Sequence, residues 1–440
     1  MNKTVSLYTL GCKLNFAETS AIGKQFIGNG YKVVGENEKA DVYVINTCTV
    51  TENAEKDCRQ VVRKFLRNNP EAFVIVTGCY AQLRPEQIAG IDGVDLVLGS
   101  KEKFDVFSYL RTNSKNETAC IFTSPTEQLN SEFGKAYSSE ADSRTRAYFK
   151  IQDGCDYKCS FCTIPLARGQ SRSMKPDEAV RHFNQLLEEG YKEIILTGVN
   201  VGDFQTSTGD GLIYLLKELN RINGDFRLRI SSIEPNLLIP EIIELVASSD
   251  KFCDHFHIPL QSGNDKILRL MQRRYSVKDY EKVIHEVARR IPSAGIGVDV
   301  ISGFPGEDEN DFLDTYNFLK DMPVSYLHPF TYSERPDTKA IDFQGKVDVA
   351  IRRKRTNMLR ILSEKKRFEF FQKASDSVLN VLFESNNEEG RIKGFSSNYI
   401  RCETAYDGDL VNNIVPVRIT NITPSICTTE LAFEKSVALI

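Results

Sequence analysis

The amino-acid sequence predicts an α/β protein of three folded units, and three observations lead to this prediction. From residue 4 to about 110, short β-branched segments alternate with helical patterns, which is typical of a small α/β domain with a parallel sheet. Between 147 and about 335 the alternation returns in six longer units, which indicates a partial (β/α)6 TIM-like barrel. After about 375, short strand-like pieces separated by turn residues predict a small antiparallel β-barrel.

These patterns place the domain boundaries. We expect an N-terminal domain at 1–112, a polar linker at 113–143, a barrel domain with a terminal basic helix at 144–373 and a C-terminal barrel at 374–440.

Composition excludes several classes of protein. The chain has 440 residues and a net charge of -4, so it is not a polycation that binds nucleic acid by bulk charge, and any RNA contact must be local. Its eleven cysteines are too dilute for a disulfide scaffold and fit reduced thiols or metal ligands better. We find no signal-peptide pattern and no apolar stretch of membrane-spanning length, and therefore expect a cytoplasmic protein without a membrane partner.

Three cysteines of the N-terminal domain occupy equivalent places. Cys12, Cys48 and Cys79 each lie just beyond the carboxyl end of a predicted strand, and in open α/β sheets these ends line the binding crevice. We expect them to converge on an iron-sulfur cluster with one open iron. The alternative is three buried small side chains, as expected for Cys58, Cys253, Cys402 and Cys427, while Cys120 in the linker is incidental.

The first strand of the predicted barrel leads into a second set of cysteines. Cys155, Cys159 and Cys162 have the spacing C-x3-C-x2-C, and three thiolates this close can hold three corners of a 4Fe-4S cluster while one iron stays open. A structural zinc site is the alternative, but structural zinc is bound by four ligands and the sequence has no fourth ligand near these three cysteines. The spacing resembles the radical SAM motif, with Phe161 in its aromatic place, which implies that S-adenosylmethionine chelates the open iron and is cleaved to a 5'-deoxyadenosyl radical.

The end of the barrel domain is strongly basic. Between Lys346 and Lys373 the chain has ten Lys and Arg against three acids, in a helical pattern whose buried side would be Leu359, Ile361 and Leu362. This is either a solvated face or a phosphate-tracking surface. The C-terminal domain has nine acidic and five basic residues from 374 to 440, so RNA contact there would rest on aromatic residues such as Phe395 and Tyr399.

The whole chain resembles the radical SAM methylthiotransferases, which have an N-terminal domain with its own cluster, a radical SAM barrel and a C-terminal TRAM domain. The resemblance implies two 4Fe-4S clusters and S-adenosylmethionine. It further implies insertion of sulfur and a methyl group into an unactivated carbon-hydrogen bond, with the barrel mouth facing the N-terminal domain. The stretches that carry it are GCDYKCSFCTIPLARG, ILTGVNVGDF, RISSIEP, HIPLQSGND, DVISGFPGE and YSERPDTKA.

The resemblance also implies residues that bind the cofactor, most of them at the ends of predicted barrel strands. Loop capping or turn formation would explain many of them equally well. We assign no catalytic residue beyond the two clusters, and none to His255 or His257, which share one side of a strand. The expected cofactor-binding residues are Phe161, Gly198, Val199, Asn200, Ser231, Ser232, Glu234, Gln261, Gly303 and Pro305.

Within the family the targets are isopentenyl- or threonylcarbamoyl-adenosine at tRNA position 37, or an aspartate of a ribosomal protein. The stretch TLGCKLNFAET is most similar to the threonylcarbamoyladenosine (t6A) enzymes, which makes tRNA with adenosine 37 the expected partner. A cationic pocket made from Lys13, Arg168, Arg172 or Arg335 would suit the threonyl carboxylate. Asp337 stands where the family commonly has glycine.

The resemblance carries further expectations about partners, namely a one-electron donor such as flavodoxin or ferredoxin and a monomeric enzyme. Methylthiolation of isopentenyladenosine or of the ribosomal aspartate stays open as an alternative. A function of a different class, an iron-sulfur protein that binds RNA without modifying it, is the remaining hypothesis.

Overall fold

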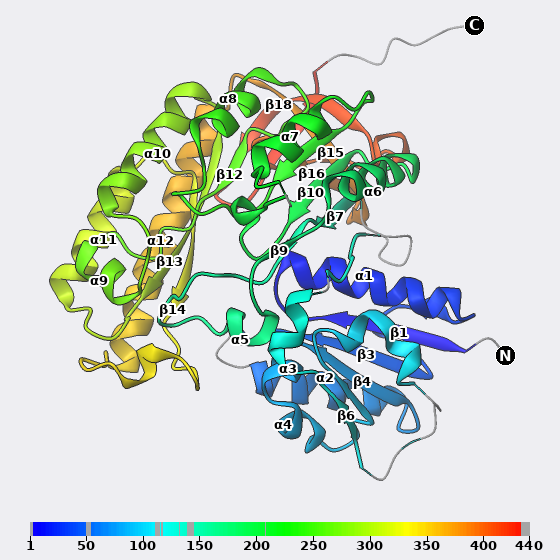
Figure 1. Ribbon diagram of the computed structural model, residues 1–440. Coiled ribbons are helices and arrows are strands. Elements are labelled where there is room, and N and C mark those ends of the chain that lie inside the picture. The colour runs from blue at the N-terminus through cyan, green and yellow to red at the C-terminus, as the bar shows by residue number, and fades with distance from the viewer. Residues whose placement is uncertain are drawn as a thin grey trace, which may run out of the picture.

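A computed structural model describes residues 3–49, 54–110, 115, 118–131, 133–138, 145–206 and 208–432. Figure 1 shows a parallel-sheet domain at the N-terminus, an open barrel covered by helices, and a small β-barrel at the opposite end of the molecule. The predicted fold class is thereby confirmed.

The N-terminal sheet is parallel throughout, with the strand order β2-β1-β3-β4-β5-β6. Its central strands β3 and β4 are buried along their whole length, as their β-branched sequences require. The last strand, β6, comes from the segment expected to be a linker and contains Cys120, so the sheet extends past the predicted boundary at 112. The elements are β1 Thr4–Thr9, α1 Lys13–Gly28, β2 Lys32–Val34, β3 Val42–Thr47, α2 Ala54–Asn68, β4 Phe73–Gly78, α3 Cys79–Leu83, α4 Pro85–Ala89, β5 Leu96–Leu98 and β6 Cys120–Phe122.

The barrel consists of two three-stranded parallel sheets, β11-β10-β7 and β12-β13-β14. Parallel bridges from Leu228 to Phe252 and from Ser232 to His257 join the sheets, so six strands follow one another around an open barrel. The strands are β7 Arg146–Lys150, β10 Glu193–Thr197, β11 Arg227–Ile230, β12 His255–His257, β13 Gly295–Ser302 and β14 Tyr326–Thr331, and the short pair β8 Gln152–Asp153 and β9 Arg172–Ser173 lies beside them.

Helices cover the outside of the barrel, and their starts are well capped. The serine and aspartate capping boxes at Ser276 and Asp308 begin α10 and α11, since their side chains accept orphan backbone N–H groups. The helices are α5 Ile164–Arg168, α6 Pro176–Glu188, α7 Leu212–Asn220, α8 Pro240–Ser248, α9 Asp265–Leu270, α10 Val277–Arg290, α11 Glu309–Asp321 and α12 Val349–Lys373. Among the described residues, no helix combines the length and apolar character that crossing a bilayer requires.

The basic helix α12 packs Leu359 and Leu362 into the barrel core, but Ile361 is exposed, so its predicted burial was wrong. Two of the basic side chains of α12 are buried and form ion pairs within the protein. Arg352 pairs with Glu334, and Arg355 pairs with Glu307 at 2.7 Å.

The C-terminal domain is a closed barrel in the order β15-β16-β17-β19-β18. Its strand pairs are antiparallel, as predicted, except for the β17–β19 pair, which is parallel. It packs on the N-terminal ends of the central strands, where Arg227 at the start of β11 donates to the Phe395 carbonyl at 2.7 Å. The strands are β15 Val378–Glu388, β16 Arg391–Ser396, β17 Arg401–Ala405, β18 Ile414–Ile422 and β19 Cys427–Leu431.

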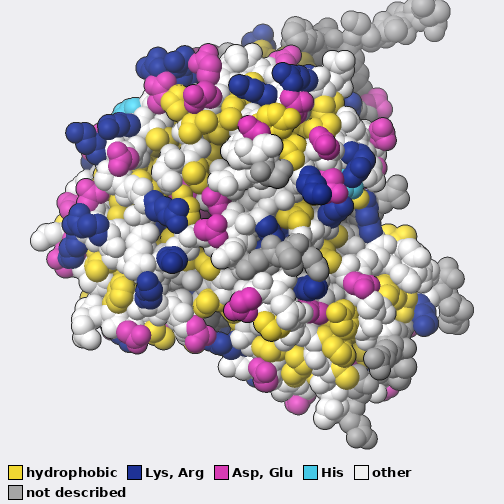
Figure 2. Space-filling model, viewed as in Figure 1, with side chains coloured by type: hydrophobic (Ala, Val, Ile, Leu, Met, Phe, Trp, Pro, Cys, Tyr) yellow, Lys and Arg dark blue, Asp and Glu magenta, His cyan; other side chains and the backbone are white. Residues whose placement is uncertain are grey.

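The face of the molecule in Figure 2 carries Lys, Arg, Asp and Glu side chains that are interspersed rather than segregated by sign. This agrees with the small net charge of the chain and gives this face no extended basic surface.

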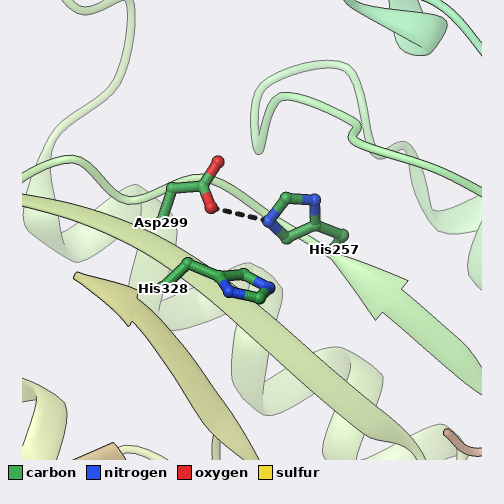
Figure 3. Close-up of side chains that lie close together, drawn as sticks. All are labelled: His257, Asp299 and His328. Carbon is green, nitrogen blue, oxygen red and sulfur yellow. Dashed lines mark hydrogen bonds and ion pairs between the residues drawn. The ribbon is translucent and has the colours of Figure 1, made fainter. Parts of the chain in front are cut away.

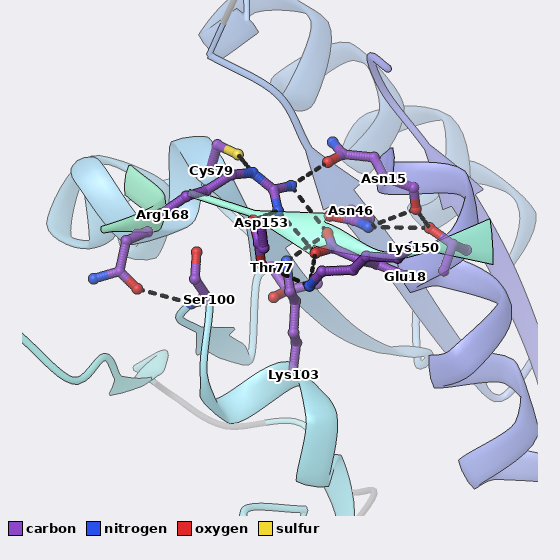
Figure 4. Close-up of polar contacts among 12 residues, drawn as sticks. Asn15, Glu18, Asn46, Thr77, Cys79, Ser100, Lys103, Lys150, Asp153 and Arg168 are labelled. Atoms are coloured by element: carbon purple, nitrogen blue, oxygen red, sulfur yellow. Dashed lines mark hydrogen bonds and ion pairs between the residues drawn. The ribbon is translucent and has the colours of Figure 1, made fainter. Parts of the chain in front are cut away.

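Helix α1 lies between the N-terminal sheet and the barrel (Figure 1), and its Glu18 is the centre of a buried ionic network. The Glu18 carboxylate accepts hydrogen bonds from Arg168 at 2.8 Å, Lys103 at 2.6 Å and Lys150 at 3.2 Å (Figure 4). Burial alone would raise the pKa of Glu18, but these cations together hold it far below its ordinary value. The two domains are thus joined by charges that have no access to water.

We expect Glu18→Gln to lower the free energy of unfolding by about 3–5 kcal/mol, because it leaves buried cations without their carboxylate. Urea unfolding of the purified chain measures this loss. The acid Glu178, in an exposed pair with Lys135, provides the control, and Glu178→Gln should change the midpoint little. Equal midpoints for the two variants would contradict the central role of Glu18.

Candidate catalytic cavity between the N-terminal domain and the barrel

The C-x3-C-x2-C loop lies between β8 and α5, at the mouth of the barrel. Its sulfurs already have N–H donors: Tyr157 N is 3.4 Å from Cys155 Sγ, Ile164 N is 3.5 Å from Cys162 Sγ, and Arg273 Nη1 is 3.1 Å from Cys159 Sγ. Burial, with the neighbouring thiols, raises the pKa of Cys155 to about 12 and that of Cys162 to about 11. A metal ion must therefore displace protons from this loop, and the donor set fits an iron-sulfur cluster.

The three N-terminal cysteines meet at the carboxyl ends of neighbouring strands. Cys12 precedes α1, Cys48 follows β3, and Cys79 follows β4. Gly11 has φ of +102°, and a Cβ built there would be 2.5 Å from Cys48 Cβ, so the loop before Cys12 lies directly on Cys48. The structure thus brings together the three cysteines that the strand pattern singled out.

All three of these cysteines line one cavity of about 520 Å³, here called the central cavity. It reaches from the cysteines into the lumen of the barrel, where Thr197, Gly198, Val199, Ser231 and Ser232 border it at the ends of β10 and β11. Its far end is formed by His255, Tyr326 and Tyr399. The N-terminal domain therefore faces the barrel mouth, as the family resemblance implies.

A second cavity of about 480 Å³, here called the side cavity, borders the other cysteine loop. It is lined by Phe161, Cys162 and Gln261, three residues that the sequence assigned to the radical SAM site. The two cavities share Ile164, Asp299 and Phe330. A molecule in the side cavity would thus lie next to one in the central cavity.

Two contacts tie the cysteine sets together. Thr49, next to Cys48, and Thr163, next to Cys162, share a hydrogen bond with an Oγ1–Oγ1 distance of 3.2 Å. Arg335 donates to the Thr49 carbonyl, and the thiols of Cys162 and Cys48 both interact with its guanidinium. Burial nevertheless lowers the pKa of Arg335.

The predicted cofactor-binding residues divide into two groups. The side chain of Asn200 is buried, and neither its Oδ1 nor its Nδ2 has a hydrogen-bond partner among the described residues, so it fits a polar ligand. Glu234 instead pairs with Arg273, and Gly303 packs on the side chain of Arg352. Neither of these two residues lines the two cavities, and the same holds for buried Pro305 and for Asn200.

The four predicted substrate-binding cations have different surroundings. Arg168 is buried, and all five of its N–H groups are taken, by Glu18, Asp153, Asn15 and Cys79. Arg168 borders the central cavity, but its N–H groups are all engaged by other residues of the protein.

Arg172 donates to Asp153 at 2.9 Å and borders a third cavity of about 430 Å³ that no cysteine lines, and Arg335 borders the side cavity. Only Lys13 has its side chain in the central cavity without an ion pair or hydrogen bond to any described residue. Lys13 is thus the one candidate in the central cavity that is not already engaged by an ion pair or hydrogen bond among the described residues.

Several cavity residues were not predicted. His257 Nε2 is 2.9 Å from Asp299 Oδ1, and His328 lies beside this pair (Figure 3). Asp299 and His328 are register partners on β13 and β14, so both point into the lumen from one layer. The alternation of His255 and His257 on one strand was the available signal.

The C-terminal domain also reaches this cavity through Tyr399, which we expected to contact RNA from the surface. Tyr399 stacks on Phe395 with a centroid distance of 4.6 Å, and the guanidinium groups of Arg146 and Arg401 cover the Phe395 ring. Neither ring is thus offered as an open stacking platform.

Asp337, at the position where glycine was expected, has φ of +66°. Its carboxylate pairs with Arg84 of the N-terminal domain at 2.6 Å. The side chain therefore adds a contact between domains in return for a strained backbone.

Two family profiles match the chain. Residues 149–319 match the radical SAM superfamily, and residues 4–99 match the uncharacterized protein family UPF0004. These ranges cover the barrel with its cysteine loop and the N-terminal sheet with its three cysteines.

Proteins of similar sequence span almost the whole chain. The threonylcarbamoyladenosine tRNA methylthiotransferase MtaB of Bacillus subtilis is 38% identical over 427 residues, which cover 94% of this chain and 93% of that protein. The MtaB protein of Aquifex aeolicus is 39% identical over 401 residues, with 90% and 95% covered. The tRNA-2-methylthio-N(6)-dimethylallyladenosine synthase of Fusobacterium nucleatum is 30% identical over 395 residues, with 88% and 90% covered.

Among solved structures, the radical S-adenosylmethionine methyltransferase TsrM of Kitasatospora setae has a similar fold. Its TM-score is 0.56 at 13% sequence identity, and the match covers 88% of this chain and 79% of TsrM. At this identity the likeness concerns the fold alone.

The open barrel and the C-x3-C-x2-C loop at its mouth define a radical SAM protein. Because the B. subtilis and A. aeolicus relatives match over more than nine tenths of their length, the chain belongs to the radical SAM methylthiotransferase family.

The contact between Gly11 and Cys48 can be tested on its own. Gly11→Ala combines backbone strain of about 1–3 kcal/mol with a collision at Cys48. Gly30, at φ of +81°, has no atom within 4 Å of a Cβ built there, so Gly30→Ala measures strain alone. We expect a lower urea midpoint for Gly11→Ala than for Gly30→Ala, and equal midpoints would show that the cysteine loops do not touch.

Proposed function

We propose that this protein converts N6-threonylcarbamoyladenosine at position 37 of tRNA to its 2-methylthio derivative. One observation supports this more than any other: Cys12, Cys48 and Cys79 all border the central cavity, and Cys162 of the second cysteine set borders the adjoining side cavity. The names of the relatives support the choice of tRNA and of t6A. The proposed reaction takes place in the cytoplasm on a monomeric enzyme, and flavodoxin or ferredoxin would supply the electron.

In this proposal Cys155, Cys159 and Cys162 hold the radical SAM 4Fe-4S cluster. When bound, that cluster and S-adenosylmethionine supply the radical that removes hydrogen from the substrate carbon. The chain's own part is to hold the cysteine loop: Arg273 and two backbone N–H groups donate to its sulfurs. Phe161, Gln261, Gly198, Asn200, Ser231 and Ser232 would bind the cofactor between the loop and the strand ends.

Cys12, Cys48 and Cys79 would hold the auxiliary 4Fe-4S cluster that delivers sulfur. The charges beside Cys79 support an anionic group there. The buried network contains two carboxylates, of Glu18 and Asp153, against four basic groups, of Lys103, Lys150, Arg168 and Arg172. Arg168 Nε donates to Cys79 Sγ at 3.1 Å, so the excess positive charge points at this cysteine. Thiolate-ligated iron-sulfur clusters supply negative charge that would balance it.

The tRNA would be held by local basic groups rather than by the whole surface. On α12 the side chains of Arg353, Lys354, Arg360 and Lys365 are exposed, and Arg360 also borders the side cavity. Lys13 in the central cavity would face the modified base itself.

Iron analysis tests the two-cluster proposal. The reconstituted protein should bind about eight irons, and the triple variant Cys12→Ala, Cys48→Ala, Cys79→Ala about four. Cys58→Ala, at a buried cysteine on α2, is the control and should retain about eight. About eight irons in the triple variant would contradict the assigned ligands.

The reaction is tested by incubating the reduced holoenzyme anaerobically with S-adenosylmethionine and tRNA. Nucleoside mass spectrometry should find methylthiolated t6A with t6A-tRNA and no product with isopentenyladenosine-tRNA. The reverse preference would assign the protein to the other substrate. Absence of 5'-deoxyadenosine would favour a non-catalytic iron-sulfur protein.

A further inference from the structure

We propose that Lys13, His328 and the His257–Asp299 pair form a recognition site in the barrel lumen for a carboxylate-bearing polar substituent on the target base. This inference rests on the proposed function and names the residues that would select its substrate. Of these four residues, only Lys13 was expected from the sequence to bind substrate.

Lys13, His328 and the neighbouring His255 have bonding capacity that the described residues leave unused. Lys13 has no ion pair or hydrogen bond among the described residues, and its Nζ lies 6.0 Å from the centre of the Tyr399 ring. His328 makes ring contacts with His257 and Tyr326 but no hydrogen bond to a described residue. Nδ1 of His255, deeper in the same cavity, is buried without a partner. The His255 atom is costly to leave unsatisfied because it is buried, whereas Lys13 and the exposed His328 ring are accessible to an incoming ligand.

The strand register sets these groups in two layers of the lumen. His328 lies opposite Asp299, and Tyr326 lies opposite Gly297, which in turn pairs with His257. A Cβ at Gly297 would be 2.5 Å from the Tyr326 hydroxyl, so the missing side chain makes room for the ring. The lumen is thereby left open beside His257 and His328.

The nearby charges favour an anion over a metal ion. The three candidate ligand atoms of His257, Asp299 and His328 lie within 4.8 Å of one another, which alone would permit a divalent cation. The surroundings oppose one. The ammonium group of Lys13, which lies in the same cavity without a carboxylate partner among the described residues, would repel a metal cation. The lowered pKa of Tyr399 agrees with this, since burial would raise it and Lys13, Arg146 and Arg229 lower it.

The side chains of His328, Asp299 and Lys13 together offer the donors and acceptors that a polar substituent needs. Burial lowers the pKa of His328 to about 4, so near neutral pH the ring offers one N–H donor and one acceptor. Asp299 can accept from an N–H or hydroxyl while Lys13 meets a carboxylate. A threonylcarbamoyl group has a carboxylate, a hydroxyl and N–H groups, whereas an isopentenyl group has none of these.

The position of the site is consistent with the reaction. Lys13 follows Cys12 directly, and the three N-terminal cysteines line the same cavity as His257, Asp299 and His328. A base whose reacting carbon lies at the cysteines can extend its substituent into the lumen. Tyr399 closes this end in a left-handed backbone conformation with φ of +72°, so the C-terminal domain supplies the floor.

The test compares t6A-tRNA with the same tRNA carrying the methyl ester of the threonyl carboxylate. The wild-type holoenzyme should prefer the acid by about 10- to 100-fold in kcat/KM, the range expected for a charge-assisted hydrogen bond. Lys13→Met and His328→Phe should bring this ratio close to one, and Lys13→Arg should restore much of it. Iron content, measured on each variant, shows that the clusters are loaded.

Lys282→Met and His285→Phe, at two positions on α10, are the matched controls and should keep the wild-type ratio. An unchanged acid-to-ester ratio in Lys13→Met and His328→Phe would overturn the recognition site while leaving the proposed function intact. Failure of the wild type to modify either RNA would instead overturn the proposed function and the site with it. One equivalent of a non-iron metal, lost in His328→Phe, would replace the anion site with a metal site.

Discussion

The buried ionic network around Glu18 is the interaction on which the arrangement of the two main domains depends. Glu18 comes from helix α1 of the N-terminal domain, whereas Lys150, Asp153 and Arg168 come from the barrel. Because separating a buried charge from its partner is costly, this interface tolerates little displacement. Two carboxylates against four basic groups leave an excess of positive charge, and that excess lies beside Cys79. Docking of the domains and loading of the cysteines are thus coupled through one set of charges.

Helix α5 transmits this constraint to the second cysteine set. It begins at Ile164, two residues after Cys162, and ends at Arg168, whose guanidinium contacts Cys79. Five helical residues span roughly 7 Å, so the two sulfur sets are held a short and fixed distance apart. The hydrogen bond between Thr49 and Thr163 makes a second connection next to the cysteines. The space between the sets is therefore determined by rigid elements rather than by a flexible loop, as reaction between two bound groups requires.

Much of this could be predicted from local patterns, and the failures have identifiable physical causes. The positions of Cys12, Cys48 and Cys79 after strands were sufficient to bring them together, because parallel strands end at one edge. No local sequence pattern indicated that Arg168 would pair with Glu18, which lies 150 residues earlier in the sequence. The strand β6 is three residues long and lies in a polar stretch, so no periodicity could identify it. Asp299 and His328 are brought together only by the register of β13 and β14, and this register could not be predicted from the sequence.

The distribution of charge also bears on how such a chain can select one base. The C-terminal barrel is acidic, and buried contacts take up Arg352, Arg355 and Lys366 of the basic helix. The basic side chains that stay exposed in this segment lie on one helix, so attraction to the phosphate backbone is local and contributes less to binding than in a basic RNA-binding domain. Discrimination must therefore come from groups that meet the base itself. The central cavity brings such groups together, among them Lys13 and the buried His255. A substrate without matching polar groups would leave Lys13 without a carboxylate and His255 Nδ1 without a partner, and this loss provides selectivity.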